Sequence, residues 1–132
     1  MRRKGVLAAA VILAALTAAV LIARGKMPYQ DLKASEVVSA AVRLSPPDET
    51  VPIADPEELG ALLKKVVIYR EDNSYTEYSG QAVTFTLTMA DGSQEEITAY
   101  SPFLIVNGTG YRAKYEPCEQ LNRYANQLRN AG

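Results

Sequence analysis

The 132-residue chain contains no histidine, no tryptophan and only one cysteine, Cys118. Without histidine it lacks the general base of Ser-His-Asp and Cys-His nucleophile systems, the ligands of HExxH metalloproteases and the commonest ligand of zinc and copper sites. One cysteine cannot form an internal disulfide, so we expect packing alone to stabilise the fold. No phosphate-binding loop motif occurs either. The sequence therefore predicts no catalytic residue, no metal site and no bound cofactor.

Charged residues are absent from one long stretch near the start of the chain. Gly5 to Ala23 carries no charge, and Thr17 is its only polar side chain. As an α-helix this stretch would be about 28 Å long, close to the roughly 30 Å hydrocarbon core of a bilayer. Its apolar residues occupy every helical face, which excludes an amphipathic surface helix. The sequence predicts an N-terminal membrane anchor over residues 1–24, with the lipid bilayer as its partner through Gly5 to Ala23.

The flanking residues predict the orientation of this anchor and leave one alternative open. Arg2–Lys4 precede the apolar stretch, and Arg24 and Lys26 follow it. The excess of positive charge on the N-terminal side predicts a single-pass cell-membrane protein with a cytoplasmic N-terminus and a C-terminal domain outside. The alternative is cleavage after Gly25, because small residues stand where a signal peptidase cuts, and the domain would then be secreted. The apolar run exceeds the 7–15 residues usual in signal peptides, which favours the anchor.

The remaining residues, 24–132, carry 11 basic and 15 acidic side chains, a net charge of −4. This balance predicts no nucleic-acid partner and argues against a polybasic grip on anionic lipid. Residues 25–35 combine Gly25, Pro28 and mixed charge without periodicity, so we expect a tether there. Residues 36–132 suffice for one extracytoplasmic domain with a thin core.

The clearest secondary-structure pattern is a β-hairpin in the middle of the domain. Residues 83–89 alternate apolar side chains with threonine, and Ala90-Asp91-Gly92 follows. A three-residue loop with Gly92 in the left-handed conformation keeps the apolar side chains of both strands on one face, whereas a two-residue loop would not. The predicted register is defined by two pairs: Phe85 with Ile97, and Val83 with Ala99.

Other patterns predict the remaining elements of an α+β domain. A helix is expected after Asp55, a capping residue, because Pro56 suits the first helical position. A last helix is expected from Glu116-Pro117. Further strands are predicted over 38–44, 50–53, 66–69, 103–106 and 111–115. The predicted fold class is an N-terminal transmembrane helix plus a small antiparallel sheet of about four to six strands packed by two helices.

Cys118 is the one candidate for a reactive group. In the first turn of a helix the dipole would lower the pKa of its thiol, as a thiol-dependent redox protein requires. However, it shares a helical face with Leu121, Ala125 and Leu128, and no histidine can act as its base. We therefore expect a buried structural cysteine, with the reactive thiol as the alternative.

Tyrosine is abundant, with eight residues in the chain. Exposed tyrosines make contact surfaces at low entropic cost and are enriched at binding hot spots. We expect a membrane-tethered extracytoplasmic interaction or sensory module without catalytic activity, which contacts another cell-envelope protein; a small-ligand-binding domain of the cell envelope is the alternative. The candidate interaction surface consists of Asn107, Gly108, Tyr111, Tyr75 and Tyr78.

The segment from Ser101 to Asn126 contains the pattern Pro-Phe…Asn-Gly-x-Gly-Tyr…Tyr-Glu-Pro-Cys-Glu…Ala-Asn. In this it resembles a family of uncharacterised small membrane-anchored or secreted proteins of Gram-positive-type bacteria. The resemblance covers these 26 residues well and the rest of the chain only in outline. It implies export and a bacterial source. Because no activity is attached to the family, it assigns no catalytic residue.

Overall fold

The structure is a computed structural model that describes residues 25–131, and the threonine-rich hairpin stands at the centre of its sheet. Strand β4 (Ala82–Met89) turns through Gly92, whose φ is +87°, into strand β5 (Gln94–Tyr100). Phe85 lies opposite Ile97 and Val83 opposite Ala99. The predicted loop and register are therefore confirmed, and they place every large apolar side chain of the hairpin on one face.

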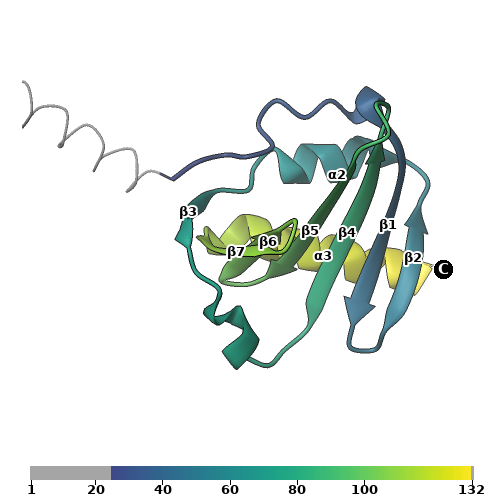
Figure 1. Cartoon of the computed structure of the whole chain (residues 1–132). Helices are drawn as coiled ribbons and strands as arrows, with labels where there is room; N and C mark the ends of the chain where they lie inside the picture. Colours follow the sequence, from purple (N-terminus) through teal and green to yellow (C-terminus); the bar gives the residue numbers. More distant parts are fainter. Residues whose placement is uncertain (1–24, 132) are drawn as a thin grey trace, which may run out of the picture.

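Five further strands extend this hairpin into one antiparallel sheet, which curves around a long helix (Figure 1). The strand order is β2-β1-β4-β5-β6-β7-β3, so β2 and β3 form the two edges. The added strands are β1 (Val37–Ser45), β2 (Glu49–Ile53), β3 (Ile68–Glu71), β6 (Phe103–Val106) and β7 (Thr109–Ala113). Two short 3-10 helices, η1 (Ala34–Glu36) and η2 (Ser74–Glu77), lie in the connections.

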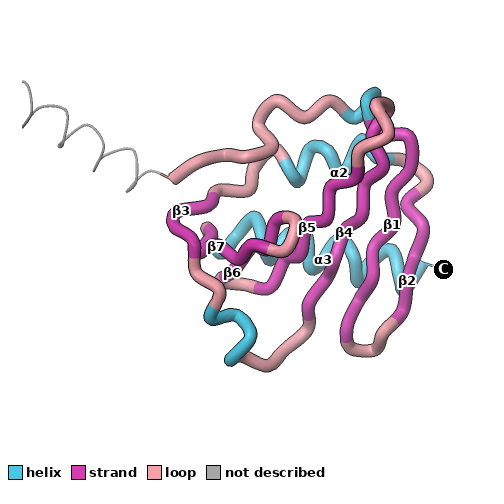
Figure 2. Tube along the Cα trace, viewed as in Figure 1, coloured by secondary structure: helices cyan, strands magenta, loops and turns pink. Residues whose placement is uncertain are grey.

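Two α-helices cover the inner face of the sheet, as Figure 2 shows. Helix α2 (Pro56–Leu63) begins where expected, because the Asp55 carboxylate accepts the Glu57 N–H at 3.0 Å. Helix α3 (Tyr115–Ala131) crosses the sheet, and its Tyr124 ring stacks on Phe85 with centroids 6.2 Å apart. The core between these layers has its largest fully buried inner-face side chains at Phe85, Leu44, Leu59, Leu63, Leu87, Ile97, Leu104 and Leu121.

The predicted fold class, a transmembrane helix plus about four to six strands, is wrong, because the sheet has seven strands. A strand is predicted over 66–69, but β3 lies at Ile68–Glu71, where the side chains are largely polar and do not alternate, and pairing of Ile68 with Ala113 fixes it at the sheet edge. Among residues 25–131 no helix is long and apolar enough to cross a bilayer. The predicted span from Gly5 to Ala23 lies outside the described residues.

Residues 25–35, expected as a tether, pack against the domain. Lys26 forms a β-bridge with Ile68 of β3. Tyr29 is buried and belongs to the hydrophobic core, and Leu32 packs against the same core. The sequence of this segment has no periodicity that could indicate burial, because its contacts are made with residues far along the chain.

Candidate functional site

The β6–β7 turn, which carries part of the predicted interaction surface, uses its polar groups within the fold. Asn107 and Gly108 adopt positive φ angles of +49° and +89°, as a two-residue hairpin turn requires. The Asn107 side-chain oxygen accepts the Glu96 N–H at 2.8 Å, and its Nδ2 donates to Glu95 Oε2 at 3.0 Å. The Asn107 amide thus extends the hydrogen bonding between β5 and β6.

The predicted tyrosines of the η2 segment cover the outer face of the sheet. Tyr75 meets Phe103 edge-on with ring centroids 6.3 Å apart, and Tyr78 lies 5.3 Å from the same ring. The Arg112 guanidinium stands 4.5 Å from the Phe103 centroid. Phe103 is fully buried under this cover, whereas Tyr78 remains 53% exposed. These aromatic side chains therefore close a small second core.

Polar contacts fix the η2 segment to β7. The Gly110 N–H donates to Asn73 Oδ1 at 2.7 Å, and the Asp72 N–H donates to the Gly110 carbonyl at 2.8 Å. The Asp72 carboxylate accepts hydrogen bonds from Ser74 and Arg112, and these hold its pKa well below the usual range. The segment is therefore attached at several points along its length.

Tyr111 lies on the opposite face of the sheet from Tyr75 and Tyr78. It pairs with Leu104 across β6 and β7, and Leu104 alternates with Phe103 along β6. The structure therefore does not bring the five predicted residues together on one surface.

Cys118 is fully buried, and its thiol points at the Phe103 carbonyl oxygen, 3.7 Å away. Burial, with a smaller contribution from the charge of Glu119, raises the pKa of the thiol to about 12. The prediction of a buried cysteine is confirmed. A protonated, inaccessible thiol is a poor nucleophile.

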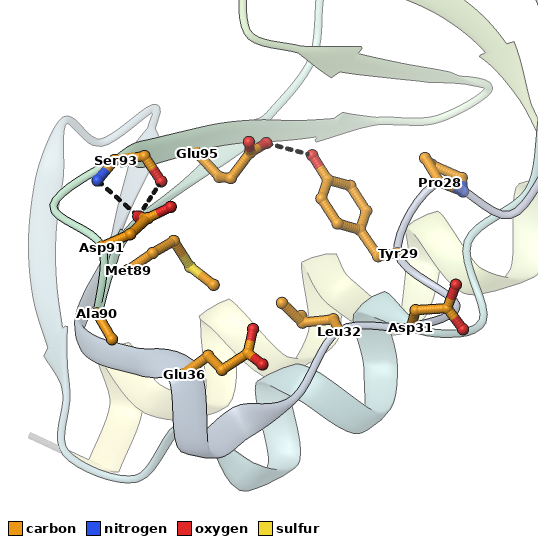
Figure 3. A pocket seen from close by; sticks show the side chains of 10 residues that line it. All are labelled: Pro28, Tyr29, Asp31, Leu32, Glu36, Met89, Ala90, Asp91, Ser93 and Glu95. Atoms are coloured by element: carbon orange, nitrogen blue, oxygen red, sulfur yellow. Dashed lines mark hydrogen bonds between the residues drawn. The ribbon is translucent and has the colours of Figure 1, made fainter.

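A cavity of about 450 Å³ lies between the segment after Gly25 and the end of the β4–β5 hairpin (Figure 3). Its apolar lining comes from Pro28, Leu32, Met89 and Ala90. The polar lining is mainly acidic and consists of Asp31, Glu36, Asp91 and Glu95, together with Tyr29 and Ser93.

Glu95 is the most firmly positioned carboxylate of this cavity. The Tyr29 hydroxyl donates to its Oε2 at 3.0 Å, and Asn107 Nδ2 donates to the same oxygen at 3.0 Å. Figure 3 shows the Tyr29 ring rising from the chain below to meet Glu95. Burial and the adjacent carboxylate raise the pKa of Tyr29, so its phenol stays a donor. Both donors are neutral, and they orient the carboxylate without cancelling its charge.

Within the part of the chain that the structure describes, no basic side chain lines the cavity. Among the described residues, none of its carboxylates (Asp31, Glu36, Asp91, Glu95) forms a salt bridge. Asp91 accepts hydrogen bonds from Ser93, through the hydroxyl at 2.6 Å and the backbone N–H at 2.9 Å, and these bonds lower its pKa. Over residues 25–131 no group of three such side chains is arranged to hold a metal ion. Carboxylates beside an apolar wall are chemically suited to an organic cation.

A second hollow, of about 280 Å³, adjoins a cluster of amides. Gln81 Oε1 accepts from Asn122 and Asn126, at 3.1 and 2.9 Å, and Gln81 Nε2 donates to the Pro46 carbonyl. These amides satisfy one another and fasten the start of β4 to α3, which gives them a structural role.

No sequence pattern predicts the first cavity. Its walls come from residues 28–36 and 89–95, which meet only in the folded chain, and residues 28–35 belong to the predicted tether. The aperiodic charge of the first segment carries no local signal of a site.

No family model, curated protein or solved structure matches this chain. The resemblance of residues 101–126 to membrane-anchored or secreted proteins stays a prediction.

Proposed function

We propose that this chain is a non-catalytic ligand-binding module of the cell envelope, held at the membrane through Gly5 to Ala23. Its ligand is an organic cation, an amine with an apolar body, bound in the cavity between Tyr29 and the β4–β5 hairpin. One observation carries the proposal: four carboxylates, without a counter-charge among residues 25–131, line a cavity of about 450 Å³ that also has an apolar wall.

The apolar lining supports binding of a hydrocarbon body. Leu32 and Met89 are partly buried and pack against the core, so the wall they form is continuous with a rigid layer. Each methylene that leaves water for such a wall contributes about 0.8 kcal/mol. A short alkyl chain can therefore contribute several kcal/mol before ordering costs.

The carboxylates supply the recognition of charge. Glu95 is held in place before any ligand arrives, because Tyr29 and Asn107 both bond to its Oε2. A charge-assisted hydrogen bond from an ammonium group to such a carboxylate contributes about 1.5–3 kcal/mol. Glu36 and Asp31, further around the cavity, add longer-range attraction.

Three probes with one hydrocarbon body test this proposal: n-hexylamine, n-hexanol and n-hexanoate. We expect n-hexylamine to raise the melting temperature of the full chain in detergent, n-hexanol to raise it less, and n-hexanoate to leave it unchanged. Glu95→Gln keeps an acceptor for Tyr29 and removes the charge, so the dissociation constant for n-hexylamine should rise by about tenfold or more. Glu77→Gln, outside the cavity, should change nothing. Equal stabilisation by amine and carboxylate would contradict the proposal.

A further inference from the structure

The described chain begins at a fixed point on the edge of the sheet. The Lys26 N–H donates to the Ile68 carbonyl at 2.7 Å, and the Ile68 N–H donates to the Lys26 carbonyl at 2.8 Å. Gly25 is equally constrained, because a Cβ there would lie 2.6 Å from Val67 Cγ1 and 2.8 Å from Tyr69 Cδ1. In Figure 1 this start lies beside β3, while β2 forms the other edge of the sheet.

The chain between the apolar stretch and this fixed point is very short. Only Arg24 and Gly25 stand between Ala23 and Lys26, so the Cα atoms of Ala23 and Lys26 lie within about 11 Å of each other. The headgroup layer on each side of a bilayer is about 5–8 Å thick. If Gly5 to Ala23 occupies the hydrocarbon core, the β3 edge lies at the membrane surface.

The side chains at this edge suit a membrane interface. We define the entry edge as Lys26, Met27, Tyr69, Arg70, Lys114 and Tyr115. Its segments are adjacent, because Lys26 bonds to Ile68 and the Lys114 N–H donates to the Val67 carbonyl at 2.9 Å. Three of the five large hydrophobic side chains exposed in residues 25–131 belong to it: Tyr115 at 59%, Met27 at 42% and Tyr69 at 38%. Tyrosine and long basic side chains are the residues that membrane interfaces favour.

Positive charge is concentrated in the same place. The entry edge contains three of the ten basic residues in 25–131, Lys26, Arg70 and Lys114, and none of the fifteen acidic residues. Of the two acidic residues next to it in the sequence, Glu71 and Glu116, the second forms a salt bridge with Arg123 at 2.8 Å. Among the described residues Lys26, Arg70 and Lys114 form no salt bridge. The domain as a whole carries net negative charge, which argues against binding to anionic lipid. The entry edge itself is positively charged, so this argument does not apply to it.

We propose that the entry edge rests on the outer surface of the bilayer and binds anionic phospholipid headgroups. The inference depends on the membrane attachment in the proposed function and deepens it, since it assigns the orientation of the folded domain. Each basic residue near an anionic surface changes the ratio of docked to undocked domain by about fivefold. The exposed tyrosines and Met27 would lie at headgroup level.

The full chain, reconstituted in vesicles, tests this orientation with two fluorophore positions. Glu71→Cys places a label on β3, and Thr50→Cys places one on β2, while the buried Cys118 stays unlabelled. A lipid with a nitroxide on its headgroup quenches labels near the surface. We expect stronger quenching at position 71 than at position 50, and a larger difference with about 30 mol% phosphatidylglycerol than with phosphatidylcholine alone.

Two charge variants complete the test. The triple variant Lys26→Gln, Arg70→Gln, Lys114→Gln should reduce the docked-to-undocked ratio by about a hundredfold. It should therefore abolish the difference in quenching between positions 71 and 50. The matched triple Lys33→Gln, Arg43→Gln, Arg129→Gln alters net charge equally and should preserve the difference in quenching between positions 71 and 50. Equal quenching at both positions, or equal effects of the two triples, would overturn the inference. If the chain floats with vesicles yet the labels are quenched equally, only the docking fails; if it does not float, the membrane attachment fails as well.

Discussion

The β6–β7 turn with its η2 cover and the cavity under Tyr29 are both polar and partly exposed, and they share the bond from Asn107 to Glu95. They differ in how charge is balanced. Around the turn, Asp72 meets Arg112, Asn107 completes a strand pair, and the aromatic rings pack on Phe103. In the cavity, no cation balances the carboxylates among the described residues. Exposed polar groups therefore indicate a ligand site only where the fold leaves their charge uncompensated.

The largest expected effect is a loss of stability when the aromatic cover is disrupted, without a loss of ligand binding in the cavity. Phe103→Ala removes the fully buried centre of the aromatic cover, so it should lower the free energy of unfolding by about 3–5 kcal/mol. Chemical denaturation followed by circular dichroism measures this loss. Tyr78→Ala, which truncates a half-exposed ring, should cost less than about 1 kcal/mol. The affinity for n-hexylamine should survive Phe103→Ala, and its loss would show that the regions are not independent.

A smaller loss tests the close contact between the η2 segment and β7. A Cβ at position 110 would lie 2.6 Å from the Asp72 carbonyl oxygen and 2.7 Å from the Tyr75 ring. Gly110→Ala should therefore destabilise the protein by about 1–3 kcal/mol. Gly60→Ala, in helix α2 with only ordinary contacts to Ala34, should instead stabilise it by about 0.5–1 kcal/mol. Destabilisation of similar size at both glycines would contradict the close contact.

A pH titration tests the burial of the Cys118 thiol. The thiol pKa of about 12 in the folded protein lies above its unfolded value of about 8.5. Below about pH 8.5 the thiol is protonated in both states, so its titration does not lower the free energy of unfolding. As the pH rises from about 8.5 toward 12, the unfolded state alone loses the proton, and the free energy of unfolding falls by about 1.4 kcal/mol per pH unit. Comparison of wild type with Cys118→Ala between pH 7.5 and pH 10 isolates this effect from other titrating groups. Parallel pH profiles would place the thiol in contact with water.

The smallest expected effect is the dependence of n-hexylamine affinity on ionic strength. Raising the ionic strength from about 0.1 M to about 1 M shortens the Debye length from about 10 Å to about 3 Å. Binding of n-hexylamine should weaken about threefold, because the more distant carboxylates are then screened. Isothermal titration calorimetry measures the change, and n-hexanol should bind equally in both buffers. An unchanged amine affinity would limit recognition to direct contact with Glu95.

Local patterns predicted the parts of this fold that depend on near neighbours. The hairpin register at Phe85 follows from alternation and turn length, and the helix start at Asp55 follows from its capping bond. The burial of Cys118 follows from the helical spacing of its apolar neighbours. Each of these features is decided by residues close together in the sequence.

The remaining features depend on contacts between distant residues. Strand β3 has no alternation and exists because β7 pairs with it. Tyr29 stands in an aperiodic segment, and its partner Glu95 lies 66 residues away. The cavity could not be predicted from the sequence for the same reason, because neither of the two segments that line it has a distinctive pattern of its own. The predicted surface residues do not share one face, because Tyr75 packs on Phe103 whereas Tyr111 pairs with Leu104, and a sequence pattern does not give the face that each one occupies.

The comparison between the two regions is tested most directly by an NMR titration of the 15N-labelled full chain with n-hexylamine. Backbone amide shifts should change in segments 28–36 and 89–95, which supply the lining of the cavity. Residues 75–78 and 109–111, around the second core, should keep their positions. Shift changes confined to those residues, or none in the cavity at saturating amine, would contradict it.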